Sequence, residues 1–321
     1  MKILITGGGG FLGFRLARTL LARGALGGKP ISSITLLDGA FPPGAESLQK
    51  VKAVTGDVSD AETIAGVCAP DTDAVFHLAA VVSGAAEADF DLGMRVNLKG
   101  IEVLLAQLRK CSRPPRLVYT SSVAAFGGDL PAVLDDATIA NPQTSYGAQK
   151  VIGEYLITDY SRKGFVDGRS LRLPTIVVRA GKPNAAASSF ASGVIREPLN
   201  GVASECPVAP ETGVWLLSPG KVVDAFIHAW ELPPEAWGSQ RWLNLPGITA
   251  SVAEMVEALR RVAGDAVARR VLYKADARIQ AIVKTWPVNF RTPRALAMGF
   301  KPDADVESVI RAYIADEKIK I

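Results

Sequence analysis

The stretch KILITGGGGFLG, residues 2–13, decides the fold class of this chain. Residues 2–6 have the pattern of a buried strand, and the glycines begin directly after it. Leucines then recur at intervals of four, as on one face of a helix: Leu12, Leu16 and Leu20. Gly24 follows as a helix stop. The sequence therefore predicts a strand, a glycine-rich loop and an amphipathic helix in immediate succession.

Three of these glycines have the spacing of a nucleotide-binding turn. Gly7 permits a sharp turn, Gly10 lets the backbone approach a pyrophosphate, and Gly13 lets the helix pack closely on the strand. The helix N-terminus then offers free N–H groups and a partial positive charge to the phosphates. A glycine pattern alone is weak, but its place between a strand and a helix favours a dinucleotide site over a merely flexible turn.

Strand–helix alternation continues through the first half of the chain. Further strands are predicted at 33–38, 51–54, 74–78, 116–120 and 171–178, the last interrupted by Pro174. Helical patterns lie at 87–111 and 145–163 and, later, near 219–231, 251–263 and 303–316. Such alternation indicates a parallel sheet with helices on both faces. We therefore predict an α/β protein with a Rossmann-type doubly wound domain at 1–173. A smaller α/β part at 174–321 is expected mainly to bind substrate, with 214–231 packing back on the first domain.

Asp38 ends the second predicted strand of the Rossmann domain, 25 residues after Gly13. A carboxylate at this place hydrogen-bonds the adenosine ribose and repels the 2′-phosphate of NADP. No Lys or Arg follows within ten residues to offset that repulsion. The sequence therefore favours NAD over NADP. The alternative is that Asp38 only caps the turn that follows it.

Composition excludes several other classes of function. The 36 Lys and Arg nearly balance the 32 Asp and Glu, and no run of five like charges suggests a nucleic-acid partner. Three widely spaced cysteines and two histidines give neither a disulfide framework nor a zinc cluster, so we expect no metal. The N-terminus lacks a signal-peptide pattern, and no apolar run of 18 residues suggests a membrane span. A cytoplasmic protein is expected.

Tyr146 and Lys150 lie one helical turn apart and therefore share a helix face. A phenol ionises near pH 10, but a neighbouring ammonium lowers that pKa and makes tyrosine a usable general base or acid. A Tyr/Lys pair at this spacing is usually a surface pair. Here it follows the fifth predicted strand, whose end carries Ser122, and ligands of such sheets bind beyond the carboxyl ends of the strands. We therefore predict catalysis by Ser122, Tyr146 and Lys150.

These residues resemble the extended short-chain dehydrogenase/reductase family, which includes sugar-nucleotide epimerases and dehydratases. The likeness spans nearly the whole chain and selects Ser122 over Ser121, because Ser122 lies four residues before Phe126. Many epimerases of the family have tyrosine where this chain has Phe126. The resemblance implies a homodimer formed by the helices at 87–111 and 145–163. It also implies the residues that bind NAD: Gly7, Gly10, Phe11, Leu12, Gly13, Asp38, Asp57, Val58, Leu78, Ala79, Ala80, Asn97, Tyr146, Lys150 and Pro174.

Four segments carry a closer likeness to dehydrogenases of four-carbon sugar acids within that family: 77–84, 142–146, 173–179 and 181–190. This likeness implies NAD-dependent oxidation of the C2 hydroxyl of an acid such as D-erythronate. A carboxylate needs a cation or several donors, and sugar hydroxyls need polar partners. The candidates for substrate binding are Ser83, Ser122, Tyr146, Arg179, Lys182, Asn184, Ser188 and Arg196.

Each candidate also has a structural alternative. Arg179 could form a structural ion pair, Lys182 and Arg196 could be surface charges, and Ser188 could cap a helix that starts near Phe190. Two other functions stay open. One is a nucleotide-sugar epimerase or dehydratase that retains NAD. The other is a cofactor-sensing regulator, against which the intact serine, tyrosine and lysine argue.

Overall fold

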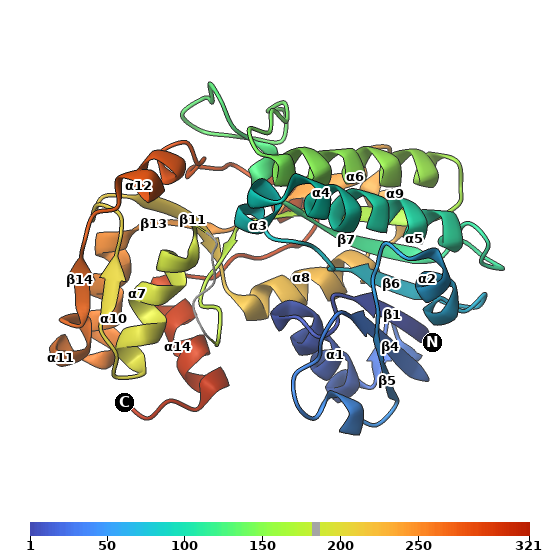
Figure 1. The fold of residues 1–321 in the computed structure, drawn as a ribbon, viewed down its shortest axis with the longest axis horizontal. Helices are drawn as coiled ribbons and strands as arrows, with labels where there is room; N and C mark the ends of the chain where they lie inside the picture. The colour runs from blue at the N-terminus through green and yellow to red at the C-terminus, as the bar shows by residue number, and fades with distance from the viewer. Residues whose placement is uncertain (182–186) are drawn as a thin grey trace. The chain divides into compact units, whose positions relative to one another are not determined.

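The computed structural model describes residues 1–181 and 187–321 (Figure 1). The chain divides into two compact units. The first comprises Met1–Ala125, Thr144–Arg172 and Val223–Leu243, and the second comprises Phe126–Gln143, Leu173–Val222 and Asn244–Ile321. Relative to the predicted boundary at residue 173, Phe126–Gln143 belongs to the second unit and Val223–Leu243 belongs to the first. Which part binds substrate stays a prediction.

A seven-stranded sheet forms the centre of the first unit. Its strands run in the order β12 (Trp242–Asn244), β8 (Asp167–Leu173), β7 (Arg116–Ser122), β6 (Ala74–His77), β1 (Lys2–Thr6), β4 (Ser33–Asp38) and β5 (Val51–Thr55). β1 pairs in parallel with β4 on one side and with β6 on the other. The strand order therefore reverses at β1, which is where ligands bind in doubly wound sheets. The predicted Rossmann-type α/β class is confirmed.

Helices cover both faces of this sheet. They are α1 (Phe11–Arg23), α2 (Ala61–Val67), α5 (Gly100–Leu108), α6 (Ser145–Arg162) and short helical segments at Ala45–Ser47, Val123–Ala125 and α9 (Pro234–Trp237). Figure 1 shows α5 and α6 side by side over one face and α1 over the other. α1 buries Leu16 and Leu20, as the leucine spacing predicts, and ends where Gly24 adopts a left-handed conformation. A small hairpin, β2 (Ala25–Leu26) and β3 (Lys29–Pro30), follows it.

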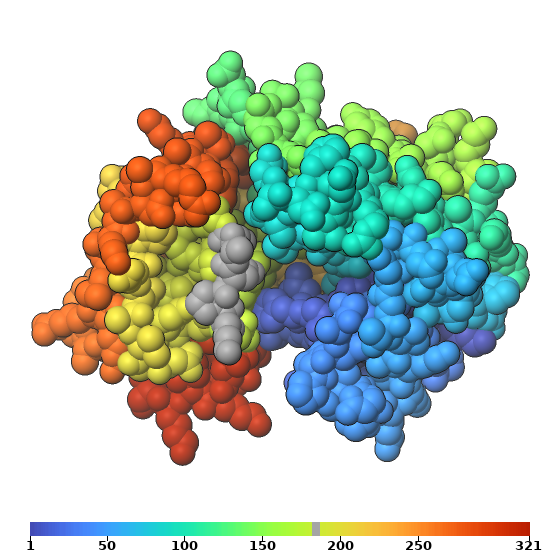
Figure 2. Space-filling view, in the orientation of Figure 1, coloured from blue at the N-terminus to red at the C-terminus, as the bar shows by residue number. Residues whose placement is uncertain are grey.

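The single helix predicted at 87–111 is wrong. The structure has α3 (Ser83–Ala88), α4 (Phe90–Gly93) and a π-helical segment, η2 (Met94–Lys99), before α5. Asp89 causes the first break, because its extended backbone ends α3 while its side chain accepts a hydrogen bond from Leu92 N and caps α4. The space-filling view shows this teal segment on the surface of the first unit that faces the viewer (Figure 2).

The predicted strand 171–178 is two strands in different sheets. β8 ends at Leu173, and β9 (Thr175–Ile176) pairs with β11 (Gly213–Leu217) in the second unit. Pro174 lies between them and lacks the N–H that a continuous ladder needs. β11 also pairs with β13 (Ile248–Ser251) in antiparallel orientation, which gives a three-stranded sheet.

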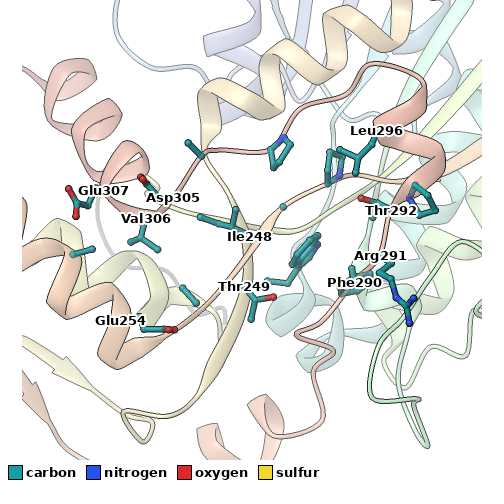
Figure 3. Close-up of a pocket in the computed structure, with 18 of the residues that line it drawn as sticks. Ile248, Thr249, Glu254, Phe290, Arg291, Thr292, Leu296, Asp305, Val306 and Glu307 are labelled. Atoms are coloured by element: carbon teal, nitrogen blue, oxygen red, sulfur yellow. The ribbon is translucent and has the colours of Figure 1, made fainter.

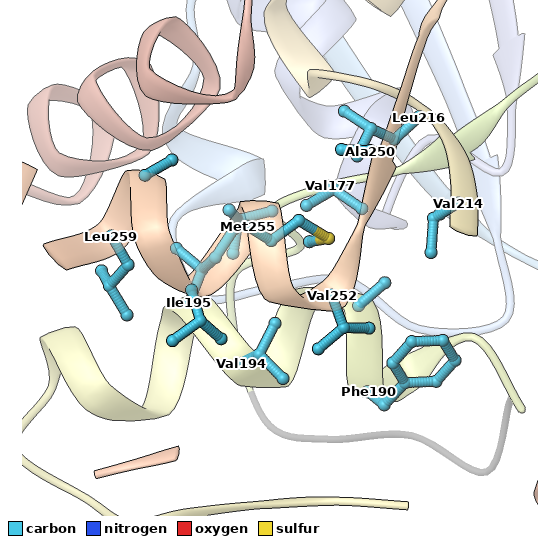
Figure 4. Packing of buried hydrophobic residues seen from close by; sticks show 14 of the residues in the cluster. Val177, Phe190, Val194, Ile195, Val214, Leu216, Ala250, Val252, Met255 and Leu259 are labelled. Atoms are coloured by element: carbon cyan, nitrogen blue, oxygen red, sulfur yellow. The ribbon is translucent and has the colours of Figure 1, made fainter. Parts of the chain in front are cut away.

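The second unit has its own apolar core. Figure 4 shows Val194 and Ile195 of α7 (Ser189–Leu199) packed against Val252, Met255 and Leu259 of α10 (Val252–Ala263). The other elements of this unit are β10 (Ser204–Cys206), β14 (Val271–Tyr273), α11 (Asp265–Ala268), α12 (Ala277–Val283), α13 (Pro293–Ala297) and α14 (Val306–Glu317).

Helix α8 (Pro219–Glu231) ends within the first unit. Its last carbonyl groups accept hydrogen bonds from strand arginines: Arg116 and Arg169 donate to Trp230 O at 2.9 and 2.7 Å, and Arg169 also donates to Ala229 O. Asp167 balances both guanidinium groups. Guanidinium groups at a helix C-terminus satisfy carbonyls that have no partner in the helix, which fixes this end of α8. No helix of the described chain has the length and apolar character needed to cross a membrane.

Candidate active site

The glycine loop between β1 and α1 has the space that a pyrophosphate needs. A Cβ on Gly13 would lie 2.0 Å from Gly7 O, so glycine is required for close packing of the loop on the helix. A Cβ on Gly10 would meet only Gly7 O at 3.2 Å and Asp38 Oδ2 at 4.0 Å. Gly10 is the N-cap of α1, it has no capping side chain, and the first turn of α1 contains no acidic residue. This cradle fits the phosphates of a dinucleotide.

Asp38 lies at the carboxyl end of β4 and faces the loop. Its Oδ2 accepts hydrogen bonds from Gly9 N at 3.0 Å and Gly10 N at 3.1 Å. The bond that a simple turn cap would make, from Ala40 N to Oδ1, is longer at 3.4 Å. Asp38 therefore does more than cap the next turn. Its carboxylate next to the loop fits a ribose with free hydroxyls and opposes a 2′-phosphate.

The loops after β5 and β6 are held by side chains. Asp57 accepts from Ser59 N at 2.8 Å and pairs with Arg95. Burial alone would raise the pKa of Asp57, but the hydrogen bonds from Ser59 and the charge of Arg95 hold it below its usual value. Asn97, in the π-helical turn, bonds both backbone groups of Val81. The amide of Asn97 thereby fixes the loop that follows β6. A direct contact of Asn97 with the cofactor stays a prediction.

The end of β7 distinguishes the two neighbouring serines. Ser121 is buried and donates to the carboxylate of Glu154. Ser122 is half-buried, and its Oγ accepts a hydrogen bond from Ala124 N at 3.1 Å, which leaves the hydroxyl proton free to donate elsewhere. The hydrogen-bonding pattern therefore supports Ser122 as the serine available to a substrate.

Helix α6 presents Tyr146 and Lys150 in the predicted arrangement. Thr144 begins the helix by accepting a hydrogen bond from Gly147 N. Lys150 is 1% exposed, and its Nζ lies 5.5 Å from the centroid of the Tyr146 ring. Burial lowers the pKa of Lys150 to about 7, although the charge of Glu154 opposes the shift. Tyr146 is half-buried and so lies nearer the surface than the lysine beneath it.

Three further residues surround Lys150 that sequence reasoning missed. The Tyr119 ring lies under Lys150, with its centroid 4.8 Å from Nζ, and Glu154 lies one turn further along α6. Arg172 of β8 binds both oxygens of Glu154, at 2.8 and 2.6 Å. A glutamate four residues after Lys150 and an arginine inside an apolar strand were the signals that could have found this pair.

Arg179, Ser188 and Arg196, three of the other predicted substrate residues, lie in the second unit. Arg196 is buried rather than a surface charge, and it donates to Arg179 O at 2.8 Å and to Glu197 at 2.6 Å. Ser188 is the N-cap of α7, but its side chain makes no capping hydrogen bond. Lys182 and Asn184 lie outside the described residues. Ser83, in the first unit, begins α3.

A pocket of about 980 Å³ lies within the second unit. Figure 3 shows Ile248 and Leu296 lining it, with Arg291 toward one end and Glu254 and Glu307 toward the other. None of the residues predicted to bind cofactor or substrate is among its described lining residues. We therefore place the candidate chemistry at the end of β7, which carries Ser122, and at α6, where Lys150 lies beside Tyr146, and not at this pocket.

Known proteins resemble this chain over nearly its full length. The model of a family described as the NAD dependent epimerase/dehydratase family matches residues 3–230. D-erythronate dehydrogenase of Cupriavidus necator is 58% identical, with 98% of both chains covered. D-erythronate dehydrogenase of Haemophilus influenzae is 43% identical, with 98% of this chain and 99% of that protein covered. A solved structure described as a nucleoside-diphosphate-sugar epimerase from Agrobacterium tumefaciens has a TM-score of 0.94 at 40% identity, covering 99% of this chain and 94% of that one.

Proposed function

Because this chain belongs to the NAD-dependent epimerase/dehydratase family, we propose that it oxidises the C2 hydroxyl of D-erythronate to give 2-dehydro-D-erythronate. The family predicted from the sequence is confirmed, as are NAD as the cofactor and the dehydrogenase class. The observation that supports the substrate is the identity of 58% and 43% to two D-erythronate dehydrogenases over nearly the whole chain.

The proposed acid–base chemistry uses the groups at the end of β7 and the start of α6. When bound, NAD accepts the hydride from C2 of the substrate. Ser122 donates a hydrogen bond to the C2 oxygen, since its own oxygen is already held by Ala124 N. Tyr146 takes the hydroxyl proton as general base. The buried ammonium of Lys150 stabilises the phenolate, because a nearby positive charge favours the ionised phenol.

The substrate carboxylate needs a cation. Arg179, Lys182 and Arg196 are the candidates for this cation, with Ser83, Asn184 and Ser188 for the hydroxyls; Arg196 also donates to Arg179 O and Glu197. A charge-assisted hydrogen bond contributes roughly 1.5–3 kcal/mol. Loss of the true partner should therefore raise KM for the acid by about 10- to 150-fold, at about 1.4 kcal/mol per decade.

A nucleotide-sugar epimerase is the second candidate, because the Agrobacterium tumefaciens protein of similar structure carries that description. An epimerase regenerates its NAD within each cycle and releases no NADH. The test is incubation with NAD and D-erythronate in one reaction, and with UDP- and GDP-sugars in another. NADH in amounts equal to the acid consumed supports the dehydrogenase. Epimerised nucleotide sugar without NADH would support the epimerase.

Helix α6 exposes large apolar side chains. Ile152 and Tyr155 on α6 are 41% and 68% exposed, which supports a homodimer through this helix. Equilibrium sedimentation of the wild type and a Tyr155→Glu variant would test it, and a monomeric wild type would contradict it.

All three cysteines are free thiols, as expected for a reducing compartment, which supports a cytoplasmic location.

A further inference from the structure

A row of polar side chains crosses the sheet beneath α6. Thr6, His77 and Tyr119 are register partners on β1, β6 and β7. His77 Nδ1 lies 2.6 Å from Thr6 Oγ1, and its ring stacks on Tyr119 with centroids 5.7 Å apart. Burial and the charge of Lys150 lower the pKa of His77 to about 3, and burial raises that of Tyr119 well above its usual value. His77 and Tyr119 are therefore neutral below Lys150.

Glu154 is a buried carboxylate on α6 that bonds side chains of two strands. The Glu154 and Arg172 side chains are each 2% exposed, and the two-point bond between them joins α6 to β8. Ser121, the residue directly before Ser122, donates to the same carboxylate and joins β7 to α6. Glu154 thus connects the end of β7, which carries Ser122, to α6, which carries Tyr146 and Lys150.

Glu154 also lies one helical turn after Lys150 on α6, so the two side chains are on the same face. A buried ammonium loses its proton readily unless a negative charge offsets the loss of hydration. Among the described residues, the groups that face Lys150 are the neutral His77 and Tyr119, the Tyr146 phenol and Glu154, with Arg172 beyond Glu154. Glu154 supplies the negative charge in this group, and the more distant Arg172 weakens its effect without cancelling it.

We propose that Glu154 is a positioning residue that sets the end of β7 against α6 through Ser121 and holds Lys150 in its ammonium form beside Tyr146. The inference rests on the proposed dehydrogenase only for its effect on turnover. Its effect on the charge of Lys150 can be measured without substrate or cofactor.

The first test is the titration of Lys150 in the apo-protein. The 15N signal of its side chain is followed by NMR against pH and assigned by its loss in Lys150→Arg. Glu154→Gln keeps the shape and the acceptor for Ser121 but removes the charge. We expect the Lys150 midpoint to fall by about one pH unit or more, the lower end of the effect of a nearby opposite charge. Glu102→Gln, on the exposed surface of α5, is the matched control and should leave it unchanged.

The second test separates the hydrogen bond between Ser121 and Glu154 from the negative charge of Glu154. Ser121→Ala removes the hydrogen bond from β7 to Glu154 but keeps the Glu154 carboxylate, so the midpoint of the Lys150 titration should not change. Because Ser122 is displaced, kcat should fall about 10- to 100-fold. Glu154→Asp keeps the charge and should restore the midpoint lost in Glu154→Gln. In Glu154→Gln the kcat–pH limb that reports Tyr146 should move to higher pH, because a neutral lysine no longer stabilises the phenolate.

A Lys150 midpoint in Glu154→Gln that equals the wild-type midpoint would overturn the role of Glu154 in holding the charge of Lys150. Native kcat in Ser121→Ala would overturn the role in positioning, and this outcome can be read even if Glu154→Gln fails to fold. Failure of the wild type to oxidise D-erythronate would instead reject the proposed function. The titration of Lys150 would then still decide the inference about charge.

Discussion

Replacing Gly10 by alanine should separate folding from cofactor binding. Gly10 has φ −72° and ψ 165°, which alanine adopts freely, and its added methyl would meet only Gly7 O at 3.2 Å and Asp38 Oδ2 at 4.0 Å. Alanine is a poorer N-cap than glycine by about 0.5–1 kcal/mol. The reduced freedom of the unfolded chain returns about 0.4–1 kcal/mol. The free energy of unfolding without NAD should therefore change by less than about 1 kcal/mol.

The same methyl group occupies the surface to which the pyrophosphate must come close. NAD affinity should fall at least tenfold, which corresponds to about 1.4 kcal/mol. Urea unfolding without NAD and calorimetric titration with NAD give the two quantities. Native NAD affinity in Gly10→Ala would refute the placement of the pyrophosphate at this loop.

Two other glycines are controls for the substitution itself. In Gly13→Ala the methyl would lie 2.0 Å from Gly7 O, a backbone atom, so this variant should lose about 1–3 kcal/mol or more of stability. Apart from the backbone of α2 itself, nothing lies within 4 Å of a Cβ added at Gly66, so Gly66→Ala should gain about 0.5–1 kcal/mol and bind NAD normally.

Three further predictions concern single side chains. Asp38→Ala removes the acceptor of two loop N–H groups and should lower the ratio of kcat/KM for NAD to that for NADP. An unchanged ratio would contradict the prediction that Asp38 selects NAD over NADP. Tyr146→Phe should reduce turnover by about 10²–10⁴-fold and leave the Kd for NAD nearly unchanged, whereas Lys150→Ala should damage both; a Tyr146→Phe enzyme of native rate would exclude Tyr146 as the base. His77 has a pKa of about 3 when folded against about 6.5 unfolded, so its contribution to stability is complete above pH 6.5 and is lost as the pH falls toward 3. Urea unfolding should show a slope smaller by up to about 1.4 kcal/mol per pH unit in His77→Asn within that window, and equal slopes would show that His77 does not titrate this way.

The sequence predicts the local structure around the glycine loop well because its signals are local and agree with one another. The strand, the glycine loop, the helix and its stop at Gly24 each come from neighbouring residues, and the structure has all of them. Ser122 could be preferred to Ser121 by its spacing from Phe126, and the hydrogen bonds of the two serines support the same choice.

What the sequence did not reveal depends on partners far along the chain. The buried Arg196 needs Arg179 O as an acceptor, and that partner lies 17 residues away. The rings of Trp215 and Phe290 stack with centroids 5.1 Å apart, but no sequence periodicity relates the two residues. The break at Asp89 was missed because the helical periodicity continues across it while a local side-chain cap overrides the pattern.

Transfer of the C2 hydrogen tests the central claim most directly. D-erythronate carrying deuterium at C2 is incubated with the wild-type enzyme and NAD, with Tyr146→Phe as the control that binds but does not turn over. The account predicts one deuterium recovered in NADH for each 2-dehydro-D-erythronate formed. Unchanged D-erythronate, together with a nucleotide sugar that is epimerised with no net NADH, would contradict it.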